Sequence, residues 1–360
     1  MTSNPSINVY AGPKAREQIR SQGICQQQFE VMAGASGGPK WFTLFGLDCY
    51  LFGEFFASRQ TPLYTLGSSA GAWRMACFAQ EDPVAAIKRL AHYYSRETYS
   101  EKPDANEISD KAMLMLDKVL GTTGGEEIAN SSMVQSHFIV ARAKGLNASE
   151  NSLAQLTGLL TAAAANAVSR QKIDRYFERI IFHTNNTDFT RSFFDFEDKP
   201  TQYVGLSAEN THPALMASGA IPMVLRGVSA IPGVPAGTYR DGGIIDYHLD
   251  LNFNTDKLVL YPHFFPQIKP GWFDKKLKGR KASLKNFENV VMVTPSESHV
   301  AQLPFGKISD RTDFQVLDSK KRFQYWQKVM DESHKMADDF QKLVETGAGI
   351  GELIPIEQIL

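Results

Sequence analysis

The chain has little cysteine and none of the histidine patterns that metal sites use. Its 360 residues include three cysteines, Cys25, Cys49 and Cys77, which stand singly and form no C-x-x-C pair. Such a set predicts neither a disulfide framework nor a zinc site. The 8 histidines show no H-x-x-x-H or H-E-x-x-H spacing, so none is assigned to a metal. We therefore expect a protein of the reducing cytoplasm that folds without disulfides, metals or cofactors.

The sequence also lacks an excess of either charge and any long apolar run. The 38 lysines and arginines nearly balance the 39 aspartates and glutamates, so no nucleic-acid partner is expected. The longest apolar stretches, residues 44–56 and 156–168, are interrupted by acidic residues or consist largely of alanine. Neither predicts a transmembrane span. Residues 1–20 contain no continuous apolar stretch, which argues against Sec export.

Short apolar runs with strand character alternate with longer helical patterns over the first two thirds of the sequence. This alternation predicts an α/β fold with a mostly parallel sheet covered by helices. No repeat or Pro/Ser-rich linker divides the chain, so residues 1–360 are expected to form a single domain. The predicted strands are residues 29–33, 63–66, 138–143, 180–183, 203–206, 258–261 and 290–293; the predicted helices are residues 39–51, 70–79, 83–95, 153–168 and 213–218.

The carboxyl-terminal third predicts a long amphipathic helix and an irregular segment before it. Asp318 or Ser319 would cap the helix, Gly347 would end it, and its aromatic stripe is interpreted as core packing. In residues 262–287, aromatic residues precede a run of basic residues that begins at Lys275. We interpret this segment as a surface excursion that is either solvated or in peripheral contact with an anionic membrane surface.

The most informative local pattern is G-x-S-x-G, formed by Gly67, Ser69 and Gly71 between a strand signal and a helix signal. A serine on such a sharp turn needs small residues two positions before and after it, because the backbone folds tightly past them. The turn also places Ser69 at a helix amino terminus, which favours negative charge on a substrate oxygen. The pattern predicts a nucleophile; the alternative is an ordinary tight turn. The neighbouring Ser68 lacks the symmetric glycines.

A glycine-rich turn, which contains Gly37 and Gly38, follows the first predicted strand and opens a helix. Backbone N–H groups in such a turn can bind an anion, including the oxyanion of a tetrahedral intermediate. A nucleotide phosphate loop would need G-x-x-x-x-G-K-[ST]. Here proline precedes Lys40 and Trp41 follows it, so that alternative fails. A tight turn with glycines for backbone reasons alone remains possible on this pattern.

The third pattern is Asp241 followed by Gly242 and Gly243. Asp-Gly-Gly is first of all a turn signal, in which the aspartate would only bond its own backbone. Alternatively, Asp241 is a general base for the serine. The pattern by itself leaves both interpretations open.

The three patterns, in this order, resemble the patatin-like phospholipase family. In that family a glycine-rich oxyanion loop with a following basic residue precedes G-x-S-x-G and then D-G-G. Residues 214–222, a small-residue helix that ends in Ala-Ile-Pro, resemble the segment before the family's aspartate turn. The resemblance covers about residues 29–247, which leaves residues 251–347 as an extension of strands and a long helix. Ser36 and Trp41 stand where the family usually has glycine.

The resemblance implies a three-layer α/β fold and metal-independent hydrolysis of acyl esters in lipids by a Ser-Asp dyad. Carried over position by position, Ser69 is the nucleophile, Asp241 the general base, and Gly37 with Gly38 the oxyanion donors. Lys40 takes the place of the family's basic residue. The expected function is therefore a phospholipase A-like lipid acyl hydrolase that acts through an acyl-enzyme.

Two alternatives to this function remain. One is an esterase with a Ser-His-Asp triad, because His248 and His263 follow Asp241 in the order that α/β hydrolases use. We interpret His248 as structural and the nearby Asp246 as solvated charge. The other alternative is a non-catalytic protein that binds a lipid or acyl group in the same pocket.

Overall fold

A computed structural model of the chain describes residues 5–184, 194 and 196–360. The described strands form one ten-stranded sheet in the order β10-β1-β9-β8-β2-β3-β4-β5-β6, and β7 pairs with β4. Neighbours run parallel except in the pairs β1–β9, β4–β5 and β4–β7. The predicted α/β class with a mostly parallel central sheet is confirmed. The strands are β1 (Ile7–Ala11), β2 (Phe29–Gly34), β3 (Leu63–Ser68), β4 (Val134–Ala143), β5 (Phe177–His183), β6 (Thr201–Gly205), β7 (Thr238–Asp241), β8 (Leu258–Pro262), β9 (Val290–Pro295) and β10 (Ile354–Pro355).

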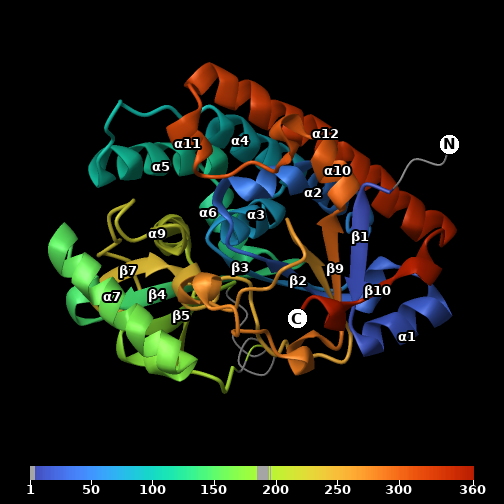
Figure 1. The fold of residues 1–360 in the computed structure, drawn as a ribbon, viewed down its shortest axis with the longest axis horizontal. Helices are drawn as coiled ribbons and strands as arrows, with labels where there is room; N and C mark the ends of the chain where they lie inside the picture. Colours follow the sequence, from blue (N-terminus) through green and yellow to red (C-terminus); the bar gives the residue numbers. More distant parts are fainter. Residues whose placement is uncertain (1–4, 185–193, 195) are drawn as a thin grey trace.

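Helices cover the sheet, and this explains why its central strands consist of buried residues. Every residue of β3, β8 and β9 is buried, as expected for strands with both faces covered. In Figure 1, α4, α5 and α12 lie above the sheet and α7 lies below its β4–β5 part. The helices are α1 (Pro13–Gln22), α2 (Phe45–Tyr50), α3 (Ala70–Phe78), α4 (Pro83–Ser95), α5 (Ala105–Leu120), α6 (Gly124–Asn130), α7 (Ser152–Val168), α9 (Ala208–Ser218), α10 (Glu297–Gln302), α11 (Asp313–Val316) and α12 (Ser319–Thr346).

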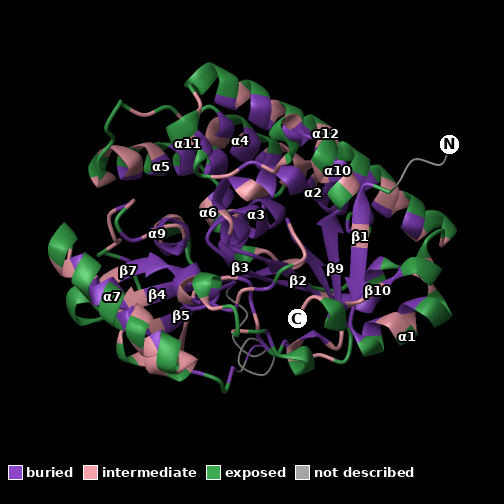
Figure 2. Ribbon diagram, viewed as in Figure 1, coloured by how far each residue is buried: buried purple, intermediate pink, exposed green. Residues whose placement is uncertain are grey.

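The burial pattern places one large core around the central strands and a smaller one under α7. Figure 2 shows buried residues concentrated in the strands, with exposed residues on the outer sides of α5, α7 and α12. None of the helices in the described part of the chain is both long enough and apolar enough to cross a membrane.

The predicted carboxyl-terminal helix is confirmed as α12. The Asp318 side chain accepts a hydrogen bond from the amide of Lys321, and the helix ends at Gly347 in the left-handed conformation, with φ 66°. Trp326 is fully buried, and its ring lies 5.1 Å from that of Phe42. The aromatic stripe is therefore core packing, and it holds α12 against the helices that follow β2.

Several elements differ from their predictions. Residues 39–51 do not form one α-helix but a 3-10 helix (Gly38–Leu44), α2 and a π-helical segment (Leu51–Phe55). The helix predicted at 213–218 is α9, which begins at Ala208 because Ser207 caps it. The predictions do not include β1, β7, β10, α1, α5, α6, α10 or α11.

The segment 262–287 is a surface excursion only in part. His263, Phe264, Asp274 and Phe287 are buried, because the aromatic residues and the aspartate pack inward, whereas most of the lysines are exposed. The segment includes a short 3-10 helix, η7 (Trp272–Lys276), near the carboxyl end of β7.

Candidate active site

The long strand β4 brings the serine turn and the aspartate turn together. Along one edge β4 pairs with β5 from His137 to Ala143. Along the other edge it pairs first with β3, up to Ser68 opposite Ile139, and then with β7, which reaches Asp241 opposite Val140. Because β3 and β7 run in opposite directions, their carboxyl ends meet. Ser69 and Asp241 are 172 residues apart in sequence and adjacent in space.

Ser69 sits on a strained turn between β3 and α3. Its φ of 56° and ψ of −127° are unusual for a residue with a side chain. A Cβ on Gly67 would lie 2.6 Å from the Cα of Ala72, and one on Gly71 would lie 1.9 Å from the carbonyl oxygen of Gly34. Both glycines are thus required by close backbone contact. The G-x-S-x-G pattern has the steric cause that a nucleophile turn needs.

The Ser69 hydroxyl donates a hydrogen bond of 2.7 Å from Oγ to Oδ2 of Asp241. The other carboxylate oxygen, Oδ1, accepts the amide of Gly243 at 2.7 Å. Asp241 therefore bonds its own turn with one oxygen and the serine with the other, so both interpretations of Asp-Gly-Gly describe real contacts. Gly242 and Gly243 are needed because Cβ atoms there would meet Ile139 O at 2.1 Å and Ser36 Oγ at 2.4 Å.

Burial shapes the electrostatics of this pair. Ser69 is 5% exposed and Asp241 is 6% exposed. Burial raises the pKa of Asp241 above its ordinary value, and the hydrogen bonds from Ser69 and Gly243 and the charges of Arg311 and Lys275 offset this only in part. A raised pKa makes Asp241 a stronger base than an exposed aspartate. It is suited to accept the serine proton.

The amide of Ser69 is occupied and does not bind substrate. It donates to Ser218 Oγ at 3.0 Å, and Ser218 Oγ in turn donates to the carbonyl oxygen of Ile139 at 2.8 Å. Ser218, at the end of α9, thus attaches the Ser69 turn, which lies between β3 and α3, to β4. Sequence reasoning missed this residue, although it lies within the small-residue segment 214–222.

The glycine loop supplies free amides to the cavity that Ser69 and Asp241 line. Gly37 and Gly38 line the same cavity as Ser69 and Asp241. Neither amide donates a hydrogen bond to another described residue. Gly38 has a φ of 55°, and a Cβ on Gly37 would lie 2.4 Å from the Phe264 ring. These positions need glycine, and the arrangement can stabilise an oxyanion.

The loop is attached to its surroundings by Ser36 and Lys40. Ser36, which departs from the family pattern, donates from Oγ to Ser68 Oγ at 3.0 Å. Lys40 forms an ion pair with Asp310, and Ser309 Oγ donates to the carbonyl oxygen of Pro39 at 2.6 Å. These two contacts attach the segment before α11 to the glycine loop. Trp41, the other departure, is buried beside Phe42.

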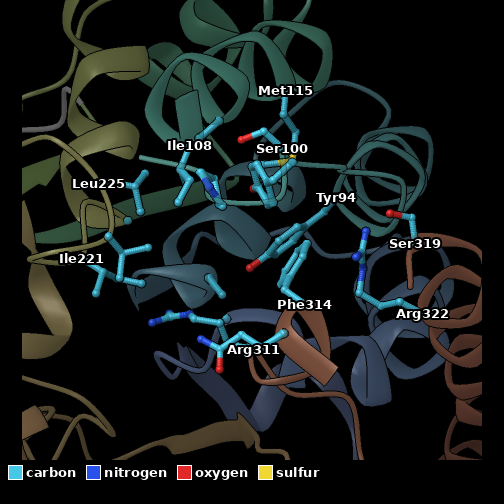
Figure 3. Close-up of a pocket in the computed structure, with 18 of the residues that line it drawn as sticks. Tyr94, Ser100, Ile108, Met115, Ile221, Leu225, Arg311, Phe314, Ser319 and Arg322 are labelled. Carbon is cyan, nitrogen blue, oxygen red and sulfur yellow. The ribbon is translucent and has the colours of Figure 1, made fainter. Parts of the chain in front are cut away.

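Two cavities meet at Ser69. One has a volume of about 650 Å³ and a largely apolar wall. Figure 3 shows its wall formed by side chains of α4, α5, α11 and the segment after α9, among them Tyr94, Ile108, Met115, Ile221, Leu225 and Phe314. The other cavity, of about 230 Å³, has a mixed wall that includes the charged side chains of Asp241, Lys40 and Lys275, and we call it the polar cavity. Gly38, Ser69, Ile221 and Arg311 line both.

The histidine alternative gains no support from the geometry. His248 is fully buried, its Nδ1 contacts the backbone of Gln267 and Lys269, and burial lowers its pKa well below the ordinary value. It lines neither cavity at Ser69. The interpretation of Asp246 as solvated charge is wrong. Asp246 is fully buried, and Arg179 and Arg170 neutralise it at 2.7 and 3.2 Å.

Sequence reasoning also missed Tyr94, Lys275 and Arg311 as residues around the serine. Lys275 was seen only as part of a basic run. Tyr94 and Arg311 carry no local pattern, and Arg311 lies far beyond the motifs in sequence.

No group of three or more potential metal-ligating side chains occurs among the residues that the structure describes. Neither a scan against models of known protein families nor a search of curated proteins finds a match to this chain.

Proposed function

We propose that the protein is a lipid acyl hydrolase of the patatin-like type, a phospholipase A-like carboxylic ester hydrolase with a Ser69–Asp241 dyad. The observation that carries the proposal is the 2.7 Å hydrogen bond from the strained Ser69 to the buried Asp241. The ordered motifs, the free amides of the glycine loop and the apolar cavity beside the serine support it. A largely apolar cavity of this size suits an acyl chain.

The geometry leads to a two-step mechanism. Asp241 accepts the Ser69 proton while Oγ attacks the ester carbonyl, and the amides of Gly37 and Gly38 hold the oxyanion. Collapse of the tetrahedral intermediate breaks the bond to the alcohol, which leaves with the proton from Asp241. A water molecule then attacks the acyl-enzyme and gives its proton to Asp241. The bond between the acyl carbon and Ser69 Oγ breaks, Asp241 returns the proton to Oγ, and the fatty acid leaves.

The first test combines p-nitrophenyl ester hydrolysis with labelling by a fluorophosphonate probe. Ser69→Ala should abolish labelling and lower kcat by about 10⁴-fold or more, because it removes the nucleophile. Asp241→Asn should lower kcat by about 10⁴-fold, because it removes the base that accepts the serine proton. Ser68→Ala is the matched control and should still be labelled.

If Ser69→Ala retained both ester hydrolysis and fluorophosphonate labelling, the assignment of Ser69 as the nucleophile would be wrong. If His248→Ala abolished turnover and Asp241→Asn did not, a triad would replace the dyad. A wild-type protein that binds lipid but is never labelled at Ser69 would be a non-catalytic binder.

A further inference from the structure

The apolar cavity at Ser69 is not apolar along its whole length. At the serine end its wall includes Ile221 and Arg311, which also line the polar cavity. Figure 3 shows Arg322 and Ser319 on the opposite side of the apolar cavity from these two residues. We call the part of the wall that Ser319 and Arg322 form the distal end. An ordinary alkyl chain has no use for polar groups at that end.

Arg322, at the distal end, is a buried cation without a carboxylate partner. It is 3% exposed, and it forms no ion pair with any residue that the structure describes. Its Nη2 donates to the backbone carbonyl of Glu97, whereas its Nε has no hydrogen-bond partner in the described part of the chain. Burial lowers the pKa of Arg322, yet a guanidinium keeps its charge in proteins. Because buried charges are usually paired, this one indicates an anionic ligand.

Two aromatic rings hold the guanidinium at the cavity wall. The Cζ atom of Arg322 lies 4.3 Å from the centre of the Phe314 ring and 5.3 Å from that of the Trp326 ring. Trp326 is fixed in turn, since it is fully buried and donates from Nε1 to Asp313 at 2.9 Å. Asp313 is itself paired with Lys307. The guanidinium is therefore orientated and shielded from water, which strengthens a hydrogen bond to an anion.

The amino terminus of α12 adds a second source of positive potential. Ser319 is the first residue of this 28-residue helix and lines the same cavity. Amide groups and the dipole at a helix amino terminus favour an anion. Asp318 is committed to the helix, because it accepts the amide of Lys321 as the cap. Glu101, the other carboxylate in the cavity wall, is exposed to water.

We propose that the distal end binds a carboxylate at the far end of the acyl chain, so that the preferred substrates are half-esters of dicarboxylic acids. This proposal rests on the proposed function and goes beyond it, because an ordinary fatty acyl chain has an uncharged end. With the ester carbonyl at Ser69, the methylene chain crosses the apolar middle of the cavity and the free carboxylate reaches Arg322. There it accepts charge-assisted hydrogen bonds from the guanidinium.

The test compares p-nitrophenyl esters that differ at the end of the acyl chain. Mono-p-nitrophenyl azelate, its methyl ester and p-nitrophenyl nonanoate present a carboxylate, an uncharged ester and a methyl group to the distal end. The wild-type protein should have the highest kcat/KM for the azelate. Among mono-p-nitrophenyl esters from adipate to dodecanedioate, kcat/KM should peak at one chain length, because Ser69 and Arg322 are held at a fixed separation.

Arg322→Met replaces the cation by an apolar side chain, which a buried site often tolerates. It should lower the ratio of kcat/KM for the azelate to that for the nonanoate by about tenfold or more, as expected when a hydrogen bond to a charged group is lost. Arg322→Lys keeps the charge and should keep part of the preference. Arg96→Gln is the matched control and should keep the ratio, because it removes an exposed arginine that stacks on Phe323 of α12 and lines neither cavity.

The comparison of the azelate with its methyl ester needs no variant, so it decides the matter even if Arg322→Met does not fold. Equal kcat/KM values for these two esters in the wild-type protein would overturn the proposal. A ratio that a folded Arg322→Met leaves unchanged would do the same.

Binding of free azelate separates this proposal from the proposed function. Azelate should raise the melting temperature of the wild-type protein and of Ser69→Ala, and it should have no such effect on Arg322→Met. If the wild-type protein hydrolyses none of the esters yet azelate stabilises it through Arg322, the proposed function fails and the carboxylate site stands. If the esters are hydrolysed without preference and azelate does not bind, the proposed function stands and the carboxylate site fails.

Discussion

At the scale of single residues, Asp241 must be charged to act as a base, yet it lies where charge is unfavourable. Its pKa is raised by burial, so the folded state binds the proton more tightly than the unfolded chain. Stability is therefore lost as pH rises through the raised pKa, when the buried carboxylate ionises. The acid limb of the kcat/KM profile should accordingly lie above the usual aspartate range.

Asp241→Asn should be inactive but more stable than the wild-type protein at pH 8, because the amide stays neutral and can keep both hydrogen bonds. The melting temperatures should converge as pH falls below the raised pKa. Asp318→Asn is the control and should melt below the wild-type protein at pH 8. The amide of Lys321 lowers the pKa of the Asp318 carboxyl and favours its charged form, which the amide side chain cannot replace. An Asp241→Asn protein that melts below the wild type at pH 8 would contradict this account.

The residues that could be predicted from sequence are those whose role has a local cause. Gly67, Gly71 and Gly242 are needed by close backbone contacts within or between short turns, and Gly243 by its close contact with the Ser36 side chain. Ser218 and Arg311 depend instead on distant partners, and no spacing rule finds them. Asp246 was misinterpreted for the same reason, since Arg179 and Arg170 are more than 60 residues away in sequence.

At the scale of elements, a buried ion pair ties the aspartate loop to β5. Arg179 and Asp246 are both fully buried, with 2.7 Å between Nε and Oδ2. Arg179→Met should lower the free energy of unfolding by about 3–5 kcal/mol, because it leaves a buried carboxylate with less compensating charge. Urea denaturation measures this loss. Lys328→Ala, which breaks an exposed pair on α12, should cost only about 0.5 kcal/mol. Equal losses would show that the buried pair does not anchor the loop.

The elements that could be predicted from sequence have strong periodicity or burial on both faces. The predicted β2, β3, β8 and β9 are mostly apolar and almost entirely buried, and α4 and α12 carry caps and amphipathic stripes. β7 has only 4 residues, and its Thr-Tyr-Arg-Asp sequence has no apolar run. It becomes a strand because β4 extends beyond β3 and offers a free edge. Composition also does not distinguish α-helix from the 3-10 and π geometry after β2.

At the scale of the whole molecule, the carboxyl-terminal third completes both the sheet and the site. β8 pairs with β2, next to the serine strand, and β9 joins β8 to β1. The same third supplies Lys275 and Arg311 to the polar cavity. The motifs could indicate the serine and the aspartate, but they carry no information about the segment that encloses them, because that segment lies outside the resemblance.

A fragment of residues 1–250 should therefore fail to fold. It would expose the edge of β2 and the apolar surfaces of Trp41 and Phe42 that α12 and its neighbours cover. We expect the fragment to aggregate in size-exclusion chromatography and to show no fluorophosphonate labelling. Co-expression of residues 251–360 should restore both a non-aggregated protein and its labelling. A monomeric fragment labelled at Ser69 would contradict this dependence.

The meeting of β3 and β7 on one edge of β4 also constrains how this chain can change length. Successive side chains of a strand point to opposite faces, so a shift of β7 by one position would turn the Asp241 carboxylate away from the hydroxyl without breaking the sheet. Insertions in the loop between α9 and β7 would leave the pairing of β7 with β4 unchanged, provided that they keep the bridge between Val228 and Tyr239. Inside the 4 residues of β7, a single insertion or deletion should separate Asp241 from Ser69 while leaving a well-folded protein.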